Sequence, residues 1–73
     1  MREIRDEILL QKIASKIKAL RNEVGISQKE LHNITDINID RLEGAKANVT
    51  VGTIQKLCKH FKITLADFFK DFN

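Results

Sequence analysis

Cys58 and His60 carry side chains of the kinds that bind metals or act as nucleophile and base in enzymes. They make no sensible metal pair, because a zinc site needs several Cys or His ligands at set spacings. Cys58 also falls on the apolar face expected for its helix, which makes it a core residue, and His60 is expected at the surface. No constellation of acid, base and nucleophile occurs elsewhere. We therefore expect no enzyme, no metal and no other cofactor.

The remaining chemistry is that of hydrogen bonds and charges, and the stretch TDINIDRLEGAKAN, residues 35–48, concentrates it. This stretch holds two strong donors, Arg41 and Lys46, together with three acids. A forked guanidinium such as that of Arg41 can donate to two acceptors at once. What these side chains can bind depends on the elements that position them.

Charge is spread unevenly along the 73 residues, which carry a net +3 and have a pI near 9.3. Residues 1–25 hold six Lys or Arg against four Asp or Glu, residues 26–48 three against four, and residues 49–73 four against two. A basic chain favours a polyanionic partner. Because the middle segment is the least basic, we expect the flanking helices to supply much of any attraction to phosphate.

Length and composition predict one small domain over residues 1–73. The chain has no proline and three glycines, which favours helices with short connections, and its one cysteine cannot form an intramolecular disulfide. The charged N-terminus MREIRDEILL lacks an apolar run long enough for a signal peptide or a membrane span. We therefore expect a cytoplasmic protein with no membrane partner.

A long first helix is predicted over residues 3–23, with residues 1–10 as an N-terminal extension that is either continuous with the helix or separate and frayed. Ile or Leu recurs at positions 4, 8, 13, 17 and 20, as on one apolar face of a helix. Gly25 is placed to end this helix in the left-handed conformation.

Three later helix starts place Ser or Thr before an apolar run, as N-caps require. They are ISQKEL with Ser27 and Glu30, VTVGTI with Thr50, and ITLADF with Thr64 and Asp67. They predict helices over about 27–33, 51–60 and 65–71. The second of these is expected to bury Val51, Ile54, Leu57, Cys58 and Phe61.

One more short helix must fit between residues 34 and 48. Its expected core is NIDRLEGA, with Asn38 as the N-cap and with Ile39 and Leu42 on one face. The five helices together predict an all-α fold, a compact five-helix bundle.

Four short patterns stand in a characteristic order: Leu20-Arg21 before Gly25, Ser27-Gln28, Leu42-Glu43, and Ile63-Thr64-Leu65 before Phe68-Phe69. In this order and spacing they resemble the lambda-repressor and Cro-like helix-turn-helix family, also called the XRE family. The resemblance covers about residues 13–70, with a helix-turn-helix core at about 27–44. It implies a lambda-repressor-like DNA-binding domain, double-stranded DNA as the partner, and a third helix that lies in the major groove.

The middle of the chain is shorter than the family pattern. Thr35 reaches Glu43 in eight steps, which removes nearly one turn from the start of the recognition helix. Such shortened versions resemble a subgroup of the family. Asp36 stands where glycine is common, and Asp tolerates the left-handed conformation better than most residues. The resemblance also implies a structural ion pair between Arg21 and Glu43.

Asp40, Arg41 and Gly44 are expected on the face of the short helix that points away from the core. Arg41 either contacts guanine or a phosphate, or is a surface arginine paired with a neighbouring Asp. Asp40 can accept from cytosine N4 but repels phosphate, and its simpler role is that of a solvated acid near Arg41 or Lys46. Gly44 either allows close backbone approach to DNA or ends the helix.

The resemblance implies three of the other DNA-binding candidates, Gln28, Lys46 and Asn48, and local helix geometry adds Lys29 and Asn38. Gln28 matches the family's phosphate-contacting glutamine, and Lys29 lies beside it at a helix start, where phosphate is attracted. Lys46 and Asn48 fall in the segment that touches the DNA backbone. Asn38 either contacts adenine or only caps its own helix.

The aromatic residues near the C-terminus predict an interface. Phe68 and Phe69 are consecutive on a short helix and cannot both face one small core, so some apolar surface is expected. The homodimer interface candidates are Phe68, Phe69 and Phe72, unless Phe68 and Phe72 are core and Phe69 only covers it. A second candidate interface is the apolar set Ile4, Ile8, Leu9 and Leu10.

The leading hypothesis is a sequence-specific transcriptional regulator, repressor-like, that binds the major groove as a dimer. A single domain leaves no room for a ligand sensor, so no small-molecule ligand is expected, and regulation would come from abundance, dimerisation or a protein partner such as a toxin. The alternative is a protein-interaction module, such as a toxin-partner antitoxin, that kept the fold and weakened or lost DNA binding. The acidic middle segment and the shortened helix favour this alternative.

Overall fold

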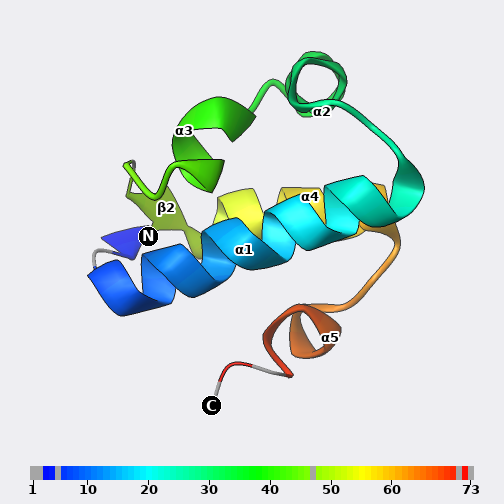
Figure 1. Cartoon of the computed structure of the whole chain (residues 1–73). Coiled ribbons are helices and arrows are strands. Elements are labelled where there is room, and N and C mark those ends of the chain that lie inside the picture. The colour runs from blue at the N-terminus through cyan, green and yellow to red at the C-terminus, as the bar shows by residue number, and fades with distance from the viewer. Residues whose placement is uncertain (1–2, 5, 47, 71, 73) are drawn as a thin grey trace.

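The computed structural model describes residues 3–4, 6–46, 48–70 and 72, with side chains from residue 6 onward. The elements in chain order are β1 (Glu3–Ile4), α1 (Glu7–Val24), α2 (Gln28–Thr35), α3 (Ile39–Glu43), β2 (Val49–Thr50), α4 (Val51–Phe61) and α5 (Leu65–Phe69). Helix α1 runs through the middle of the molecule, with α2 and α3 on one side of it and α5 on the opposite side (Figure 1). The predicted all-α fold with five helices is confirmed.

Helix α1 begins later than residue 3, where it was predicted to begin. Asp6 is its N-cap, and the Asp6 carboxylate accepts a hydrogen bond of 2.9 Å from the backbone N–H of Leu9. An Asp at this position satisfies a backbone donor that the helix leaves unpaired. The other end is as expected, because Gly25 adopts the left-handed conformation with φ 72° and its N–H donates to carbonyls of the last turn.

The predicted N-terminal extension of α1 is wrong at residues 3–4, which form a strand instead. Strand β1 pairs antiparallel with β2, so that Glu3 lies opposite Thr50 and Ile4 opposite Val49. The pair adds backbone hydrogen bonds across segments that are far apart in the chain. It thereby ties the N-terminal end of the described chain to the start of α4 (Figure 1).

The capped helix starts are confirmed at the level of individual hydrogen bonds. Ser27 accepts from the N–H of Glu30 at 3.0 Å, and the Glu30 carboxylate accepts from the N–H of Ser27 at 3.4 Å. Thr64 and Asp67 form the same reciprocal capping box. At the start of α4 the hydroxyl of Thr50 accepts from Thr53 N–H. These caps explain why α2, α4 and α5 begin within one residue of their predicted starts.

The turn between α2 and α3 is tight, and two side chains hold it. Asp36 adopts the left-handed conformation with φ 58°, as its place in the pattern predicted. Thr35 is buried, and its hydroxyl donates to the Leu31 carbonyl at 2.7 Å and accepts from the N–H of Ile37 at 3.3 Å. A buried hydroxyl thus satisfies the backbone where the helix stops. Helix α3 then spans only five residues, which agrees with the shortened recognition helix.

One hydrophobic core joins all five helices. Its buried members are Leu10, Ile13, Ile17, Leu31, Ile39, Leu42, Val49, Ile54, Leu57, Cys58 and Phe68. The Cα radius of gyration is 11.1 Å, which is about what a chain of this length has when it is well packed. Two residues predicted to be buried by α4 are not: Val51 is 43% exposed and Phe61 is only partly buried.

Candidate nucleic-acid interface

Arg21 and Glu43 form the predicted ion pair, and its geometry is bidentate. The Arg21 Nε donates to Glu43 Oε2 at 2.8 Å, and Nη2 donates to Oε1 at 3.1 Å. The remaining Nη1 donates to the carbonyl of Ile26 at 3.0 Å. Two parallel hydrogen bonds fix both the orientation and the position of the guanidinium relative to the carboxylate. The two side chains therefore join the last turn of α1 to the end of α3 and, through Ile26, to the loop between α1 and α2.

A third side chain joins this pair. The amide Nε2 of Gln28, at the first position of α2, donates to Glu43 Oε1 at 3.0 Å. The Glu43 carboxylate thus accepts from α1 and from α2 at once. Gln28 was predicted from the family pattern as a phosphate contact, and this hydrogen bond gives it a structural partner as well. We call Arg21, Gln28 and Glu43 the polar cluster.

The polar cluster is largely sealed from solvent, since the side chains of Arg21 and Glu43 are 13% and 4% exposed. Burial acts to raise the pKa of the Glu43 carboxyl, but hydrogen bonds from Arg21 and Gln28 and the charge of Arg21 outweigh it. The pKa of Glu43 therefore lies below its ordinary value. The hydrogen bond to Glu43 raises the pKa of Arg21. Both groups are held in their charged forms, as a hydrogen-bonded buried pair requires.

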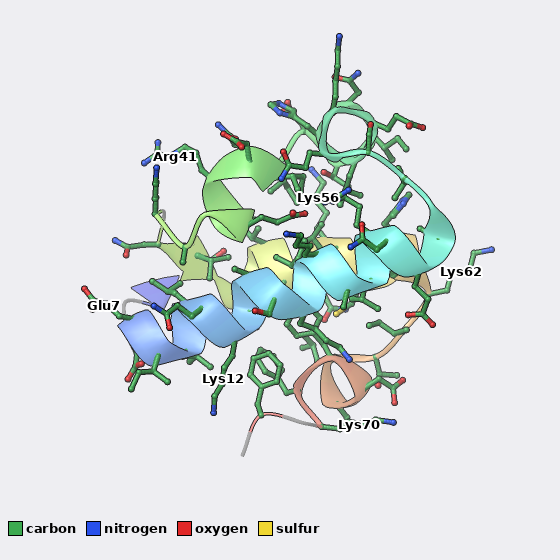
Figure 2. The ribbon with its side chains drawn as sticks, viewed as in Figure 1. Glu7, Lys12, Arg41, Lys56, Lys62 and Lys70 are labelled. Atoms are coloured by element: carbon green, nitrogen blue, oxygen red, sulfur yellow. The ribbon has the colours of Figure 1, made fainter. Side chains whose placement is uncertain are left out.

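Helix α3 turns the expected face outward. Ile39 and Leu42 are buried, whereas Asp40 and Arg41 are exposed. Figure 2 shows Arg41 projecting away from the ribbon of α3. Its backbone N–H, by contrast, donates to the side chain of Asn38 at 3.2 Å, so Asn38 caps the helix as predicted. The side-chain oxygen of Asn38, which accepts this hydrogen bond, still has one lone pair. The side-chain nitrogen of Asn38 has two N–H groups that can donate to other partners.

A hollow of about 220 Å³ lies between α3 and the start of α4. Its lining residues are Ile37, Asn38, Arg41, Leu42, Asn48, Val49 and Thr53. The structure therefore brings together three DNA-binding candidates, Asn38, Arg41 and Asn48, that the sequence placed in different segments. Thr53 also lines the hollow and was not among the candidates. Its place in VTVGTI, three residues after the N-cap Thr50, indicates a part in helix capping and gives no signal for DNA contact.

Helix α3 ends in a turn that backbone hydrogen bonds stabilise. Gly44 is the C-cap with φ −81°, and its N–H donates to the Asp40 carbonyl at 3.0 Å. The left-handed residue is the next one, Ala45, with φ 55°. The N–H of Lys46 donates to the Arg41 carbonyl at 3.2 Å, which anchors the base of that exposed lysine against α3. Lys29 is exposed near the start of α2.

Of the three aromatic residues near the C-terminus, Phe68 lies in the hydrophobic core, and Phe69 and Phe72 lie at the edge of the core. Phe68 is 0% exposed, so it presents no surface to a second copy, and its place among the interface candidates is corrected. Phe69 and Phe72 are partly buried and pack on the core. The ring centroids of Phe69 and Phe72 are 5.0 Å apart, and both rings also contact Phe68.

The second apolar set is also split by the structure. Leu10 is buried in the core and Leu9 packs against it, so neither matches the prediction of a free surface. Ile8 is 68% exposed and is the member that remains available. The side chain of Ile4 lies outside the described part of the chain.

Cys58 and His60, the two residues with side chains suited to metal binding or catalysis, are not among the residues of these surfaces. Cys58 is 1% exposed, and burial raises the pKa of its thiol, which disfavours the reactive thiolate. His60 is partly buried, with its ring 5.0 Å from that of Phe61. Over residues 6–46 and 48–70, no His, Cys, Asp and Glu side chains gather into a group able to hold a metal. Within the same ranges no helix is long and apolar enough to cross a membrane.

Comparison with known proteins agrees with this architecture. No curated protein matches the chain. The family model of the Cro/C1-type HTH DNA-binding domain, however, matches residues 6–72, which is most of the chain. The match includes the capped α2, the turn at Asp36, the short α3 and the aromatic C-terminal helix. The chain therefore belongs to the family of Cro/C1-type HTH DNA-binding domains, whose partner is DNA.

Proposed function

We propose that this DNA-binding domain is a sequence-specific, repressor-like transcriptional regulator that lays α3 in the major groove. The observation that carries the proposal is the convergence of Asn38, Arg41 and Asn48 around one hollow on the outer side of α3. Arginine and asparagine are the side chains that most often pair with base edges or bind phosphate. A groove-bound helix presents its N-terminal residues to the bases, and Asn38 and Arg41 are at that end of α3.

Helix α3 can contact few bases. Five residues span about 7.5 Å along a helix axis, and only Asp40 and Arg41 of these side chains are exposed. Asp40 repels phosphate, so Arg41 is the main candidate for reading a base, with guanine as its preferred partner. Specificity would then rest on one strong contact with support from Asn38.

Phosphate contacts supply the rest of the affinity in this proposal. Helix α2 begins at Gln28, and helix N-termini attract phosphate through free N–H groups and the helix dipole. Lys29 adds a positive charge there, and Lys46 adds one at the end of α3. The polar cluster supports the arrangement, because the Gln28–Glu43 and Arg21–Glu43 bonds hold α2 and α3 at a fixed distance from each other.

We place a homodimer contact on the exposed part of Phe69. Helix α5 lies on the opposite side of α1 from α3, so a contact through α5 leaves the α3 surface open (Figure 1). Dimers of this fold class recognise half-sites about 34 Å apart, which is one turn of DNA. A dimer with two-fold symmetry would bind an operator whose two half-sites form a palindrome.

The alternative function is a protein-interaction module, such as the antitoxin of a toxin–antitoxin pair, in which DNA binding is weak. One observation favours it: the Gln28 amide already has a partner in Glu43. The middle segment is also the least basic of the three, with three Lys or Arg against four Asp or Glu.

A salt titration of binding to random-sequence duplex DNA separates the two functions. We expect the logarithm of the affinity to fall linearly with the logarithm of salt concentration, with a slope of about −0.9 for each phosphate contacted. Fluorescence anisotropy from about 50 to 200 mM salt covers the useful range. If no duplex binds even at the lowest salt concentration, the chain is an interaction module and the regulatory proposal fails.

A further inference from the structure

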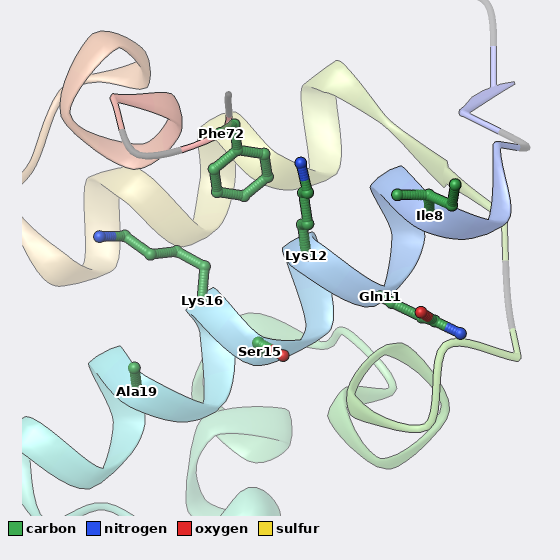
Figure 3. Close-up of a pocket in the computed structure, with 7 residues that line it drawn as sticks. All are labelled: Ile8, Gln11, Lys12, Ser15, Lys16, Ala19 and Phe72. Atoms are coloured by element: carbon green, nitrogen blue, oxygen red, sulfur yellow. The ribbon is translucent and has the colours of Figure 1, made fainter.

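The side chains expected to contact bases gather at one hollow of the protein. The hollow of about 220 Å³ beside α3 has Asn38 and Arg41 among its lining residues. A larger hollow, of about 610 Å³, lies along α1 and is lined by residues such as Ile8, Lys12 and Phe72, none of them a candidate for DNA contact (Figure 3). Under the proposed function, base recognition therefore depends on how Asn38 and Arg41 are oriented.

The side chain of Asn38 is oriented by the helix that it caps. Its oxygen accepts a hydrogen bond of 3.2 Å from the backbone N–H of Arg41. The oxygen of a capping residue faces its own helix, because the unpaired N–H groups of the first turn lie there. The nitrogen of the same planar amide points in a different direction and carries two N–H donors. The exposed side chain of Asn38 therefore offers its NH2 group to a partner outside α3.

This orientation disfavours the contact with adenine that asparagine commonly makes. A bidentate asparagine accepts from the N6 amino group of adenine through its oxygen and donates to N7 through its nitrogen. Turning the oxygen of Asn38 toward a base would take it away from the backbone N–H of Arg41 and uncap α3. Donation of hydrogen bonds is therefore the role that capping leaves to Asn38 at a base edge.

Arg41 is likewise a donor with no acceptor atom. It is exposed and lies three residues after Asn38, and residues with this spacing are neighbours on a helix surface. Two neighbouring donors match guanine, whose major-groove edge presents two acceptors, N7 and O6. Adenine and cytosine present an amino donor there, and thymine presents a single acceptor beside a methyl group. Guanine is therefore the base that these two side chains fit best.

One guanine is not enough for both side chains. A bidentate arginine uses N7 and O6 of the same guanine, so Asn38 needs an acceptor on another base. Stacked bases are about 3.4 Å apart along DNA, and three residues advance about 4.5 Å along a helix, so neighbouring base pairs are within reach. Asp40, an exposed acid between the two in the sequence, can accept from N4 of cytosine, the base paired with guanine. Two successive G·C pairs thus suit all three side chains.

We infer that α3 recognises two neighbouring guanines, one through Arg41 and the other through the side-chain NH2 group of Asn38. Asn38 is thus a specificity-determining residue that selects guanine rather than adenine. The inference rests on the proposed function, in which α3 lies in the major groove. A phosphate oxygen would satisfy the same NH2 group, so the experiment has to separate a base from a phosphate.

The test is a selection of binding sites from a random duplex library, followed by fluorescence anisotropy on the selected duplexes. The parent chain should select two neighbouring guanines, and Arg41→Ala should lose the preference at one of them. Asn38→Asp keeps the cap, because Asp and Asn cap helices about equally well, but it replaces the donor by an acceptor. This variant should exchange the second guanine for cytosine, whose N4 donates, and should keep the first guanine.

Two further variants complete the experiment. Asn38→Ser also caps a helix, but its shorter side chain should give no preference at the second position, with about a threefold to tenfold loss of affinity for the parent's site. Asn22→Asp is the matched control, because it makes the same chemical change at an exposed position in the last turn of α1. It should select the same site as the parent chain. Circular dichroism checks that each variant is folded.

The inference is overturned if the parent chain selects adenine or thymine at the position that changes in Asn38→Asp. It is also overturned if Asn38→Asp and Asn38→Ser keep the parent's site preference, or if they weaken binding to all sequences alike, which would make phosphate the partner of Asn38. In each of these cases the proposed function stands as long as Arg41→Ala relaxes the preference at the other guanine. If the parent chain binds no duplex at low salt, the proposed function itself fails and the inference fails with it.

Discussion

The side-chain amide of Gln28 donates to the same carboxylate oxygen of Glu43 that accepts from Arg21, at 3.0 Å and 3.1 Å. A residue at the start of α2 and one in the last turn of α1 therefore meet at the end of α3. This places a carboxylate that accepts three hydrogen bonds behind the surface that we assign to DNA. Changes to the ion pair of Arg21 and Glu43 should accordingly affect stability first and DNA binding second.

Replacing Arg21 by Met should destabilise the domain by about 3 kcal/mol, because it leaves the nearly buried Glu43 without its ion partner. The double variant Arg21→Met/Glu43→Met should recover a large part of that loss, since no charge is then stranded. Urea unfolding followed by circular dichroism gives both free energies. A single variant that costs less than about 1 kcal/mol, the range of an exposed pair, would show that the ion pair is solvated.

The contribution of Glu43 to stability should depend on pH. Its pKa in the folded state lies below the ordinary value of 4.5, so the unfolded chain takes up a proton first as the pH falls. The stabilisation is therefore fully present above pH 4.5 and is lost as the pH drops through the lower, folded-state pKa. Glu43→Gln should flatten this part of the curve of Tm against pH. Equal slopes below pH 4.5 in the parent and the variant would contradict this assignment.

Gln28→Ala should weaken binding to all DNA sequences alike by a few-fold, which corresponds to the loss of about one hydrogen bond to phosphate. The salt slope should stay unchanged, because glutamine carries no charge. Lys29→Ala is the matched comparison, since losing a positive charge at the neighbouring position should reduce the slope by about one. A normal affinity for Gln28→Ala would mean that its hydrogen bond to Glu43 is its whole role.

Arg41→Ala should relax sequence preference rather than abolish binding. A good bidentate contact to guanine gives about 1–3 kcal/mol of discrimination against the wrong base, and this difference should disappear in a selection from a random duplex library. Because Arg41 is exposed, stability should change by less than about 0.5 kcal/mol. Lys56→Ala, at an exposed position of α4, serves as the control. If site preference survives Arg41→Ala, α3 does not lie in the groove as we propose.

Lys62→Gly should stabilise the domain by about 0.5–1 kcal/mol. Lys62 ends α4 with φ 60°, where a side chain is strained and glycine is not. Lys59→Gly, three residues earlier and inside the helix, should instead cost about 1 kcal/mol. Thermal unfolding of both variants measures the contrast. Equal effects would mean that the left-handed conformation at Lys62 carries no strain.

The sequence predicted helix starts and turns well where a single side chain determines the local backbone conformation. Ser27, Thr50 and Thr64 each cap a helix, and the helices that follow begin within one residue of the prediction. Gly25 and Asp36 adopt the left-handed conformation for which their residue types are suited. The buried face of α3 was also predicted correctly, because two apolar residues three apart define a direction on a helix.

Some of the errors came from contacts between distant segments and others from local features. The apolar period of α1 extends back to Ile4, so the pattern alone favoured helix at residues 3–4, and the pairing with β2 overrides it. The capping role of Asp6 was available in the sequence and was missed. Val51 is apolar and lies at the start of α4, yet a first-turn position faces solvent there. The bond from Gln28 to Glu43 depends on how α2 and α3 cross, which no local pattern encodes.

The pairing of β1 with β2 also bears on how the chain is made. Ile4 and Val49 are 45 residues apart in the sequence, and synthesis proceeds at about 5–20 residues per second. The first strand therefore leaves the ribosome seconds before its partner exists, while α1 and α2 can already form. Contacts over such separations close late in folding. The start of α4, with Asn48 just before it, should thus be the last part of the DNA surface to reach its place on the nascent chain.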